Sequence, residues 1–214
     1  FGDSGLPLGM RGALLILAPL LHRHKILEIK QEIGGCSLGI REIDPHLEVF
    51  KSLGAKVTIN EKLTIDATKG LSGNTLWQDY MSVTTTENFI MAACLAKGES
   101  KMINSASEPH VQDLCNFLQG MGAQIEGIGS STIVVKGVEK LHGTEFTISS
   151  DHHEITTLLA LGAMTGGQVR VKNAIPQHFQ LINKTFAKFG VNILYDNDTA
   201  YYEINNKLKV VEPY

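Results

Sequence analysis

Residues 108–125 read EPHVQDLCNFLQGMGAQI: a proline and a histidine, an amphipathic stretch typical of a helix, a Gly-Ala step and a β-branched strand. The same pattern leads to Gly54-Ala55 and to Gly190-Val191. The glycines of the three steps, Gly54, Gly122 and Gly190, are spaced 68 residues apart. A fixed spacing of this kind indicates one supersecondary unit used several times. The sequence therefore predicts three copies of a unit of this length.

Within each unit the hydrophobic pattern predicts a strand, a helix, a strand, a second helix and two closing strands. The second helix ends at the glycine, which suits the left-handed position after a helix C-terminus. Pro45, Pro109 and Pro176 suit the first helical turn. The expected first helices are 12–21, 87–96 and 154–163, the second helices are 46–53, 110–121 and 178–189, and the strands include 25–29, 76–83, 100–103, 124–128, 132–136, 144–149 and 168–171.

This order predicts an α/β (α+β) fold of repeated βαβαββ units. The first helix of each unit is apolar over a wide face, so we expect these helices inside, wrapped by mixed sheets. The chain has 214 residues, 43% of them hydrophobic, which is enough to bury a full core in one or two domains.

Charge and cysteine usage exclude several classes of protein. The formal net charge is -3, so no broad basic face for nucleic acid is expected. Three cysteines without a compact spacing form no disulfide framework and fit a reducing cytoplasm. No sequence pattern for a metal site stands out, and the longest apolar run, residues 12–21, is too short to span a membrane. A chain that begins at Phe1 without an initiator Met suggests a fragment or a processed product.

One loop is not explained by the repeat: residues 33–41, which read IGGCSLGIR. Glycines around a cysteine make backbone amides accessible, and an arginine five residues on can hold an anion beside the thiol. This combination suits Cys36 as an acid, base or nucleophile and Arg41 as an anion clamp. The alternative is a glycine-rich surface loop with an incidental thiol. Cys94 and Cys115 lie on apolar helix faces and are expected in the core.

The run GGCSLGIR at residues 34–41 resembles the cysteine loop of the UDP-N-acetylglucosamine 1-carboxyvinyltransferases, the MurA family of enolpyruvyl transferases. Residues 10–21 (MRGALLILAPLL), 82–88 (SVTTTEN) and 104–113 (NSASEPHVQD) resemble the same family in order and spacing. The resemblance covers the chain from about Met10 onward and implies the inside-out α/β barrel of enolpyruvyl transferases. The sister enzyme of aromatic biosynthesis shares this fold but lacks the cysteine loop.

The resemblance implies transfer of the enolpyruvyl group of phosphoenolpyruvate to the 3-hydroxyl of UDP-N-acetylglucosamine, without a cofactor, as the first committed step of peptidoglycan synthesis. It makes Cys36 the proton donor that fosfomycin alkylates and Arg41 the clamp on phosphoenolpyruvate. Asp44, Ser82 and Glu154 have structural alternatives as a helix N-cap, a strand end and a first-turn glutamate. The implied substrate-binding residues are Arg11, Arg41, Glu42, Ile43, Asp44, Pro45, Ser82, Val83, Thr84 and Glu154.

Four positions depart from the family pattern. Tyr80 stands in place of a lysine, Thr84 in place of a glycine, His152 in place of an arginine, and Glu42 in place of a proline. Each change weakens the recognition of anions. Together they leave open whether the substrate is a nucleotide sugar. The cysteine and the arginine of the loop are retained.

By resemblance, residues 1–148 hold two units of the cysteine-loop lobe and residues 149–214 hold one unit of the second lobe. The alternative is that all three units close into a single pseudo-threefold domain. The family also has a Lys-Asn pair ahead of Arg11 and a PTD segment beyond Tyr214, so we expect the activity to need these flanking segments of the same protein and the chain alone to be inactive.

Two other functions compete with the transferase. One is a divergent paralogue, or an isolated piece of the fold, used for binding or assembly. The other is a nucleic-acid enzyme, because RNA 3′-phosphate cyclases are built from similar units; the charge balance and the lack of clustered Lys and Arg argue against it.

Overall fold

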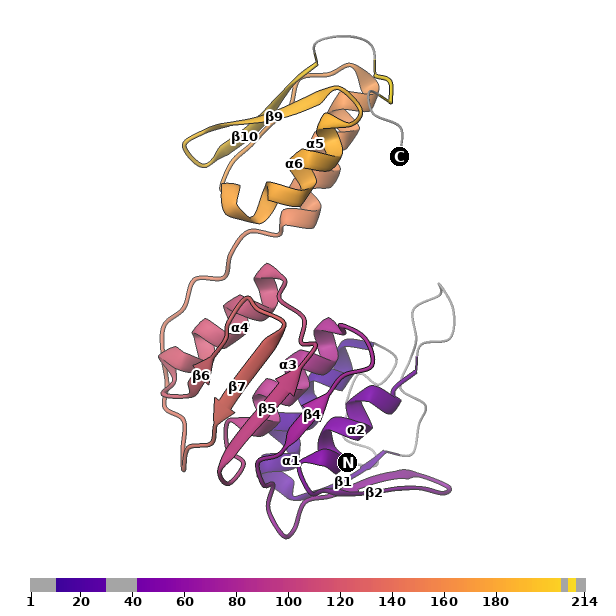
Figure 1. Cartoon of the computed structure of the whole chain (residues 1–214), viewed down its shortest axis with the longest axis vertical. Helices are drawn as coiled ribbons and strands as arrows, with labels where there is room; N and C mark the ends of the chain where they lie inside the picture. Colours follow the sequence, from indigo (N-terminus) through magenta and orange to yellow (C-terminus); the bar gives the residue numbers. More distant parts are fainter. Residues whose placement is uncertain (1–10, 30–41, 205–207, 211–214) are drawn as a thin grey trace. The chain divides into compact units, whose positions relative to one another are not determined.

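The computed structural model describes residues 11–29, 42–204 and 208–210. The chain divides into two compact units, Phe1–Phe146 and Thr147–Tyr214 (Figure 1). In chain order the first unit contains η1 (Arg11–Ile16), α1 (Leu17–His24), β1 (Ile26–Ile29), α2 (Asp44–Ser52), β2 (Lys56–Ile59), β3 (Leu63–Asp66), β4 (Thr75–Trp77), α3 (Val83–Ala93), β5 (Glu99–Ile103), α4 (Pro109–Gly120), β6 (Gln124–Glu126) and β7 (Thr132–Lys136).

Two sheets frame the first unit. One has the order β1-β3-β2 and is antiparallel, and the other has the order β4-β5-β7-β6. In the second sheet β4 runs parallel to β5 while the remaining pairs are antiparallel, so this sheet is mixed. The register places Met102 of β5 opposite Ile133 of β7, and both side chains are buried. Alternation along the two strands thus turns one face of the sheet to the core.

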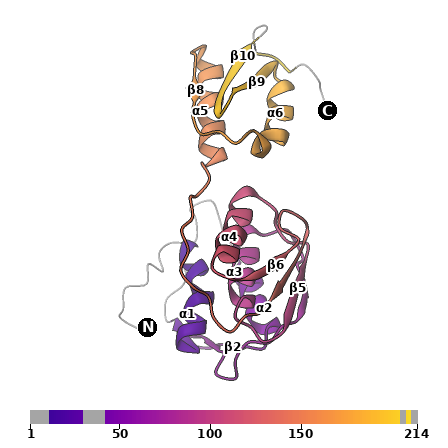
Figure 2. The ribbon, with the colours of Figure 1, turned by 90° about the vertical axis from the view of Figure 1, so that its left-hand side faces the viewer.

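Helix α3 is the centre of the first unit. It packs against α1, α2, α4 and strands β5 and β7, and Figure 2 shows it between α1 and β5. A helix that is surrounded in this way must be apolar or internally satisfied on every side. The expected position of this first helix inside the sheets is confirmed. Its buried residues are Thr85, Thr86, Glu87, Asn88, Phe89, Ile90, Ala92 and Ala93.

The predicted helix ends are confirmed by backbone geometry. Gly54, Gly122 and Gly190 follow the second helices with φ values of 94°, 97° and 77°. These left-handed conformations cost a residue with a Cβ atom far more than they cost glycine. The prolines lie at the first or second position of α2, α4 and the 3₁₀ segment η2, where a missing N–H breaks no helical hydrogen bond.

The first expected helix, residues 12–21, differs in form from the prediction. The chain runs as a 3₁₀ helix over η1 and becomes an α-helix only in α1. Pro19 explains the difference, because it has no N–H to donate to the carbonyl of residue 15 and its ring crowds that turn.

The second unit is a single helix pair on one sheet. Its helices α5 and α6 pack on a sheet of order β8-β10-β9 (Figure 1). A small core of Ile155, Leu159, Phe179 and Ile193 lies between them, while Met164 of α5 is 77% exposed. The elements are α5 (His152–Thr165), β8 (Arg170–Val171), η2 (Pro176–Phe179), α6 (Gln180–Ala187), β9 (Val191–Asp196) and β10 (Thr199–Ile204).

Two strand predictions are corrected. The strand expected over 76–83 ends at Trp77, because Ser82 caps α3 and Val83 already belongs to that helix. The strand expected over 144–149 is not formed: the backbone there is irregular. Strand β8 lies at the edge of its sheet and has only two residues, which offers segment 144–149 very little ladder to pair with.

Candidate functional site

The predicted catalytic pair lies outside the described residues. Cys36 and Arg41 both belong to the segment between β1 and α2 that the structure does not describe. Arg11 begins η1, but its side chain is likewise outside the description. The structure therefore defines the surroundings of the predicted site through the helix that follows the cysteine loop and through α3.

The N-terminus of α2 carries the residues next to the cysteine loop. Glu42 and Asp44 are exposed, and Ile43 and Pro45 are half-buried. Asp44 lies in the first turn of α2 and is not its N-cap, because Ile43 occupies that position. An aspartate in the first turn is stabilised by the helix dipole, but it adds negative charge near the predicted anion site.

The N-terminus of α3 carries Ser82, Val83 and Thr84, all half-buried. Ser82 is the N-cap, and its Oγ accepts a hydrogen bond from the Thr85 amide at 3.4 Å. The first intrahelical bond runs from the Thr86 amide to the Ser82 carbonyl at 3.0 Å, so the amides of Val83 and Thr84 precede the helical ladder. Amides in this position, together with the helix dipole, suit a phosphate group. The strand-end alternative for Ser82 is therefore wrong.

A hydrogen-bonded chain of side chains joins these two helix N-termini. Nδ2 of Asn88 donates to the Leu14 carbonyl at 2.9 Å and to Nδ1 of His46 at 2.8 Å. The amide orientation follows from the Leu14 carbonyl, which can only accept. His46 then carries its proton on Nε2, which donates to Oγ1 of Thr84 at 3.3 Å. The Thr84 hydroxyl hydrogen is directed away from His46 and can donate to a ligand.

Replacing Thr84 by valine tests this chain, because valine keeps the branched shape and removes the hydroxyl. We expect the free energy of unfolding to fall by about 0.5–1.5 kcal/mol, since His46 is buried and loses an acceptor. Urea denaturation measures the change. The matched control is Thr58→Val, an exposed β2 position; an equal loss there would show that the effect is not specific to the contact with His46.

Two acidic side chains lie deeper in the same unit. Two effects together raise the pKa of Glu87 to about 7: burial, which is the larger, and the negative charge of the Glu108 carboxylate. Oε2 of Glu108 is buried and has no hydrogen-bond partner within the described part of the chain. Burial and the charge of Glu108 both oppose the ionisation of Glu87, so this carboxyl group loses its proton only as the pH approaches about 7.

Both described cysteines are core residues, as predicted. Cys94 and Cys115 are fully buried and free, and burial raises the pKa of each thiol to about 12. A thiol in this environment is not a nucleophile, because the reactive species is the thiolate.

Glu154 lies in the second unit. It is exposed in the first turn of α5, where a glutamate favours the helix dipole, and its role in substrate binding stays a prediction. The helix is capped by Asp151, whose Oδ1 accepts from the amides of His153 at 2.7 Å and Glu154 at 3.4 Å. His152, the expected arginine position, is buried beside the ring of His178, with ring centres 6.1 Å apart.

A sequence profile of the EPSP synthase (3-phosphoshikimate 1-carboxyvinyltransferase) family matches residues 3–212 of the chain. The chain belongs to this family. Among the curated relatives of this family member, the UDP-N-acetylglucosamine 1-carboxyvinyltransferase of Borreliella burgdorferi is 41% identical over 208 residues, which are 97% of this chain and 48% of the relative. UDP-N-acetylglucosamine 1-carboxyvinyltransferase 1 of Staphylococcus aureus strain N315 is 38% identical over 206 residues, 95% of this chain and 48% of the relative. The resemblance found in the sequence is thereby confirmed.

Solved structures support the same fold for this EPSP synthase family member. The enolpyruvyl transferase NikO from Streptomyces tendae superposes with a TM-score of 0.78 at 19% identity, covering 94% of this chain and 50% of that one. An EPSP synthase from Acinetobacter baumannii superposes with a TM-score of 0.61 at 19% identity, covering 94% and 45%. The chain spans about half the length of the curated relatives it matches.

Sequence reasoning about this family member missed His46, Asn88 and the carboxyl pair of Glu87 and Glu108. His46 belongs to the repeated Pro-His step, which was interpreted as architecture only. Buried polar residues in an otherwise apolar helix are the signal that points to Glu87 and Asn88. Within the described ranges, no cluster of His, Cys, Asp or Glu is suited to hold a metal ion, and no helix there has the length and apolar character to cross a bilayer.

Proposed function

We propose that the full-length protein transfers the enolpyruvyl group of phosphoenolpyruvate to the 3-hydroxyl of UDP-N-acetylglucosamine and releases phosphate. The observation that carries this proposal is the match, over 95–97% of the chain, to relatives that bear the name of this activity. The retained loop GGCSLGIR supports the same assignment, because it supplies a thiol and a guanidinium to the site.

The reaction needs an acid, an anion clamp and a place for the diphosphate. In the addition step Cys36 gives its proton to the methylene carbon of phosphoenolpyruvate while the sugar 3-hydroxyl bonds to C2 and loses its own proton to a base. In the elimination step a methyl proton is removed, the double bond re-forms, and the C–O bond to phosphate breaks. Arg41 holds the phosphoenolpyruvate anion with parallel N–H bonds.

The N-terminus of α3 is the place we propose for the diphosphate of the nucleotide sugar. The amides of Val83 and Thr84 and the Ser82 hydroxyl gather there, and the helix dipole favours negative charge. Thr84 replaces the glycine expected from the family pattern, and its hydroxyl, oriented by His46, adds a donor where the backbone approaches less closely. Glu42 and Asp44 oppose anion binding, so we expect the affinity for the nucleotide sugar to be modest.

We further infer that the two compact units belong to two different lobes of the whole protein, with the crossover near 149–151. The second unit supports this, because α5 exposes Leu158, Leu161 and Met164 beside a single three-stranded sheet. A helix of this kind needs cover on both faces, which further units of a longer chain would supply. Cytoplasmic localisation follows from the proposed nucleotide-sugar substrate.

Alkylation by fosfomycin tests the proposal at Cys36. In the full-length protein we expect peptide mass spectrometry to find the adduct on Cys36, formed faster when UDP-N-acetylglucosamine is present, and to find none on Cys94 or Cys115, which are buried with a pKa of about 12. Cys36→Ser is the matched control and should remain unmodified. A folded protein that shows no saturable labelling of Cys36 would contradict the proposed role of the loop.

A further inference from the structure

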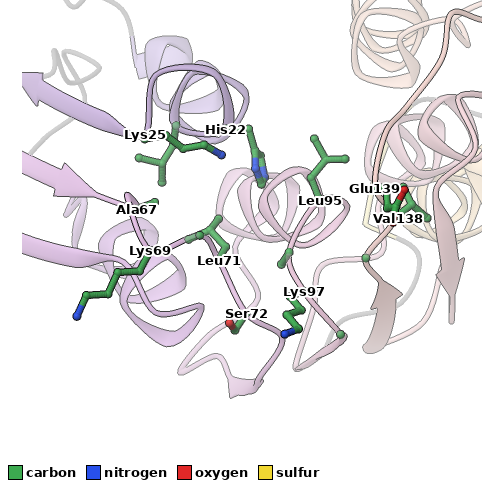
Figure 3. A pocket seen from close by; sticks show the side chains of 15 residues that line it. His22, Lys25, Ala67, Lys69, Leu71, Ser72, Leu95, Lys97, Val138 and Glu139 are labelled. Atoms are coloured by element: carbon green, nitrogen blue, oxygen red, sulfur yellow. The ribbon is translucent and has the colours of Figure 1, made fainter.

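A pocket lies in the first unit, at the end of α1 and α3 opposite to their N-termini. It has a volume of about 480 Å³ and forms where four chain segments meet: 21–25, 67–72, 95–98 and 137–139 (Figure 3). Helix α3 spans eleven residues, about 16 Å at the usual rise, so the pocket is that far from Ser82 and the proposed diphosphate site. Its volume is in the range of small-molecule sites.

The walls of this pocket are held by backbone hydrogen bonds between the segments. The Ala67 amide donates to the Lys25 carbonyl at 2.7 Å, the Lys97 amide donates to the Leu71 carbonyl at 2.8 Å, and the Gly137 amide donates to the Gly98 carbonyl at 2.9 Å. Each bond joins two of the four segments. The fold therefore sets the positions of the lining residues before any ligand binds. This lowers the entropy that is lost on binding.

The charged side chains that line the pocket are three lysines and one glutamate: Lys25, Lys69, Lys97 and Glu139. Among the described residues, none of these three lysines forms an ion pair. In a chain with a net charge of -3 this is a local concentration of positive charge. A concave surface of one sign attracts counter-ions more strongly than the same charges on a flat surface.

His22 lines the pocket, and its pKa depends on the charges around it. Its Nε2 hydrogen bonds to the Ala92 carbonyl at 2.9 Å, and the Lys25 side chain extends toward its ring (Figure 3). Burial lowers the pKa of His22 below its ordinary value, and the positive charge of Lys25 lowers it further, against the opposing effect of the Ala92 carbonyl. A bound anion would offset the charge of Lys25 and stabilise the imidazolium, so it should raise the pKa of His22.

We propose that this pocket binds a phosphate-bearing small molecule through Lys25 and Lys97, with Lys69 at its rim. Ammonium groups act as point charges on phosphate oxygens, and the described residues that line the pocket include no arginine, the residue suited to bidentate carboxylate recognition. Lys25 lies close to His22, the backbone of Lys97 forms a β-bridge with Ser72, and the side chains of Lys25, Lys97 and Ser72 all line this pocket. This site is independent of the proposed transferase chemistry.

Inorganic pyrophosphate is the probe, and the proton-carbon signal of the His22 ring is the readout. In the 214-residue chain we expect saturable shifts of this signal and a raised pKa of His22 when pyrophosphate is bound. The double variant Lys25→Gln, Lys97→Gln should weaken binding by about tenfold or more, the loss expected for two charge-assisted contacts. Glu139→Gln should tighten binding severalfold, because it removes the opposing carboxylate from the lining.

The variants separate this site from unspecific attraction. Lys184→Gln also removes a lysine charge but lies on α6 of the second unit, so it should leave the affinity unchanged. Citrate in place of pyrophosphate separates phosphate recognition from general attraction of polyanions and should bind more weakly. The proposal is overturned if the His22 signal does not respond to pyrophosphate, if Lys184→Gln weakens binding as much as the double variant does, if Glu139→Gln has no effect, or if citrate binds as tightly.

Discussion

Gly137→Ala is expected to lower the free energy of unfolding of the first unit by about 3–5 kcal/mol. A Cβ atom built at this position lies 1.6 Å from the carbonyl oxygen of Ala96 and 2.8 Å from its carbonyl carbon. The atoms in contact belong to the backbone, which cannot change rotamer as a side chain can. The strand that ends at Lys136 is also tied here by the hydrogen bond from Gly137 to Gly98, so moving it away from Ala96 breaks the edge of the sheet.

Gly143→Ala is the matched control for this substitution. It lies six residues farther along the same connection, is exposed, and has nothing within 4 Å of a built Cβ atom. We expect its effect to stay within about 0.5 kcal/mol. Urea unfolding followed by circular dichroism measures both variants. If Gly137→Ala were as mild as Gly143→Ala, the close approach of the 137–139 segment to Ala96 would be wrong, and with it the shape of the lysine-lined pocket.

Glu87→Gln is expected to stabilise the protein at pH 8 and to remove part of its pH dependence. The pKa of Glu87 is raised from 4.5 to about 7 in the folded chain, first by burial and second by Glu108. Below pH 4.5 the carboxyl group is protonated in both states. Between pH 4.5 and 7 the unfolded chain ionises first, so the free energy of unfolding falls as the pH rises, and above pH 7 the loss is complete. The total loss is about 2–3 kcal/mol.

Glutamine keeps the shape of the protonated glutamic acid and cannot ionise, so the variant should lack this loss. We therefore expect the difference in unfolding free energy between Glu87→Gln and the parent to grow by about 2–3 kcal/mol from pH 4.5 to pH 8. Glu61→Gln, at an exposed turn between β2 and β3, is the control and should follow the parent at all pH values. A parallel pH profile for Glu87→Gln and the parent would mean that Glu87 is solvated.

Periodicity predicted the fold of this chain better than it predicted the ends of its elements. The 68-residue spacing placed Gly54, Gly122 and Gly190 at helix C-termini, where the backbone is left-handed and favours glycine. The strand expected at 144–149 was wrong because a strand also needs a neighbouring strand to pair with. The local sequence pattern gives no information about that neighbour. Pro19 explains why the first helix begins as a 3₁₀ helix, an effect that apolar periodicity hides.

The sequence predicted a helix N-terminus near the candidate site and the burial of two cysteines, but it did not predict the contacts between side chains. The run SVTTTEN placed Ser82 and Thr84 at a helix N-terminus, and burial of Cys94 and Cys115 followed from their apolar faces. The contact between His46 and Thr84 joins residues 38 positions apart, so only the packing of α2 on α3 reveals it. The lysine-lined pocket likewise contains Lys25, Lys69 and Lys97, which come from three separate connections. In the sequence each of them looks like an ordinary surface lysine.

The most direct test of the proposed activity is the release of inorganic phosphate from phosphoenolpyruvate by the full-length protein. The account predicts release that depends on UDP-N-acetylglucosamine and is lost in Cys36→Ser, with transfer of the enolpyruvyl group to the sugar seen by mass spectrometry. Release that depends on 3-phosphoshikimate instead, or that is unchanged in Cys36→Ser, would contradict it.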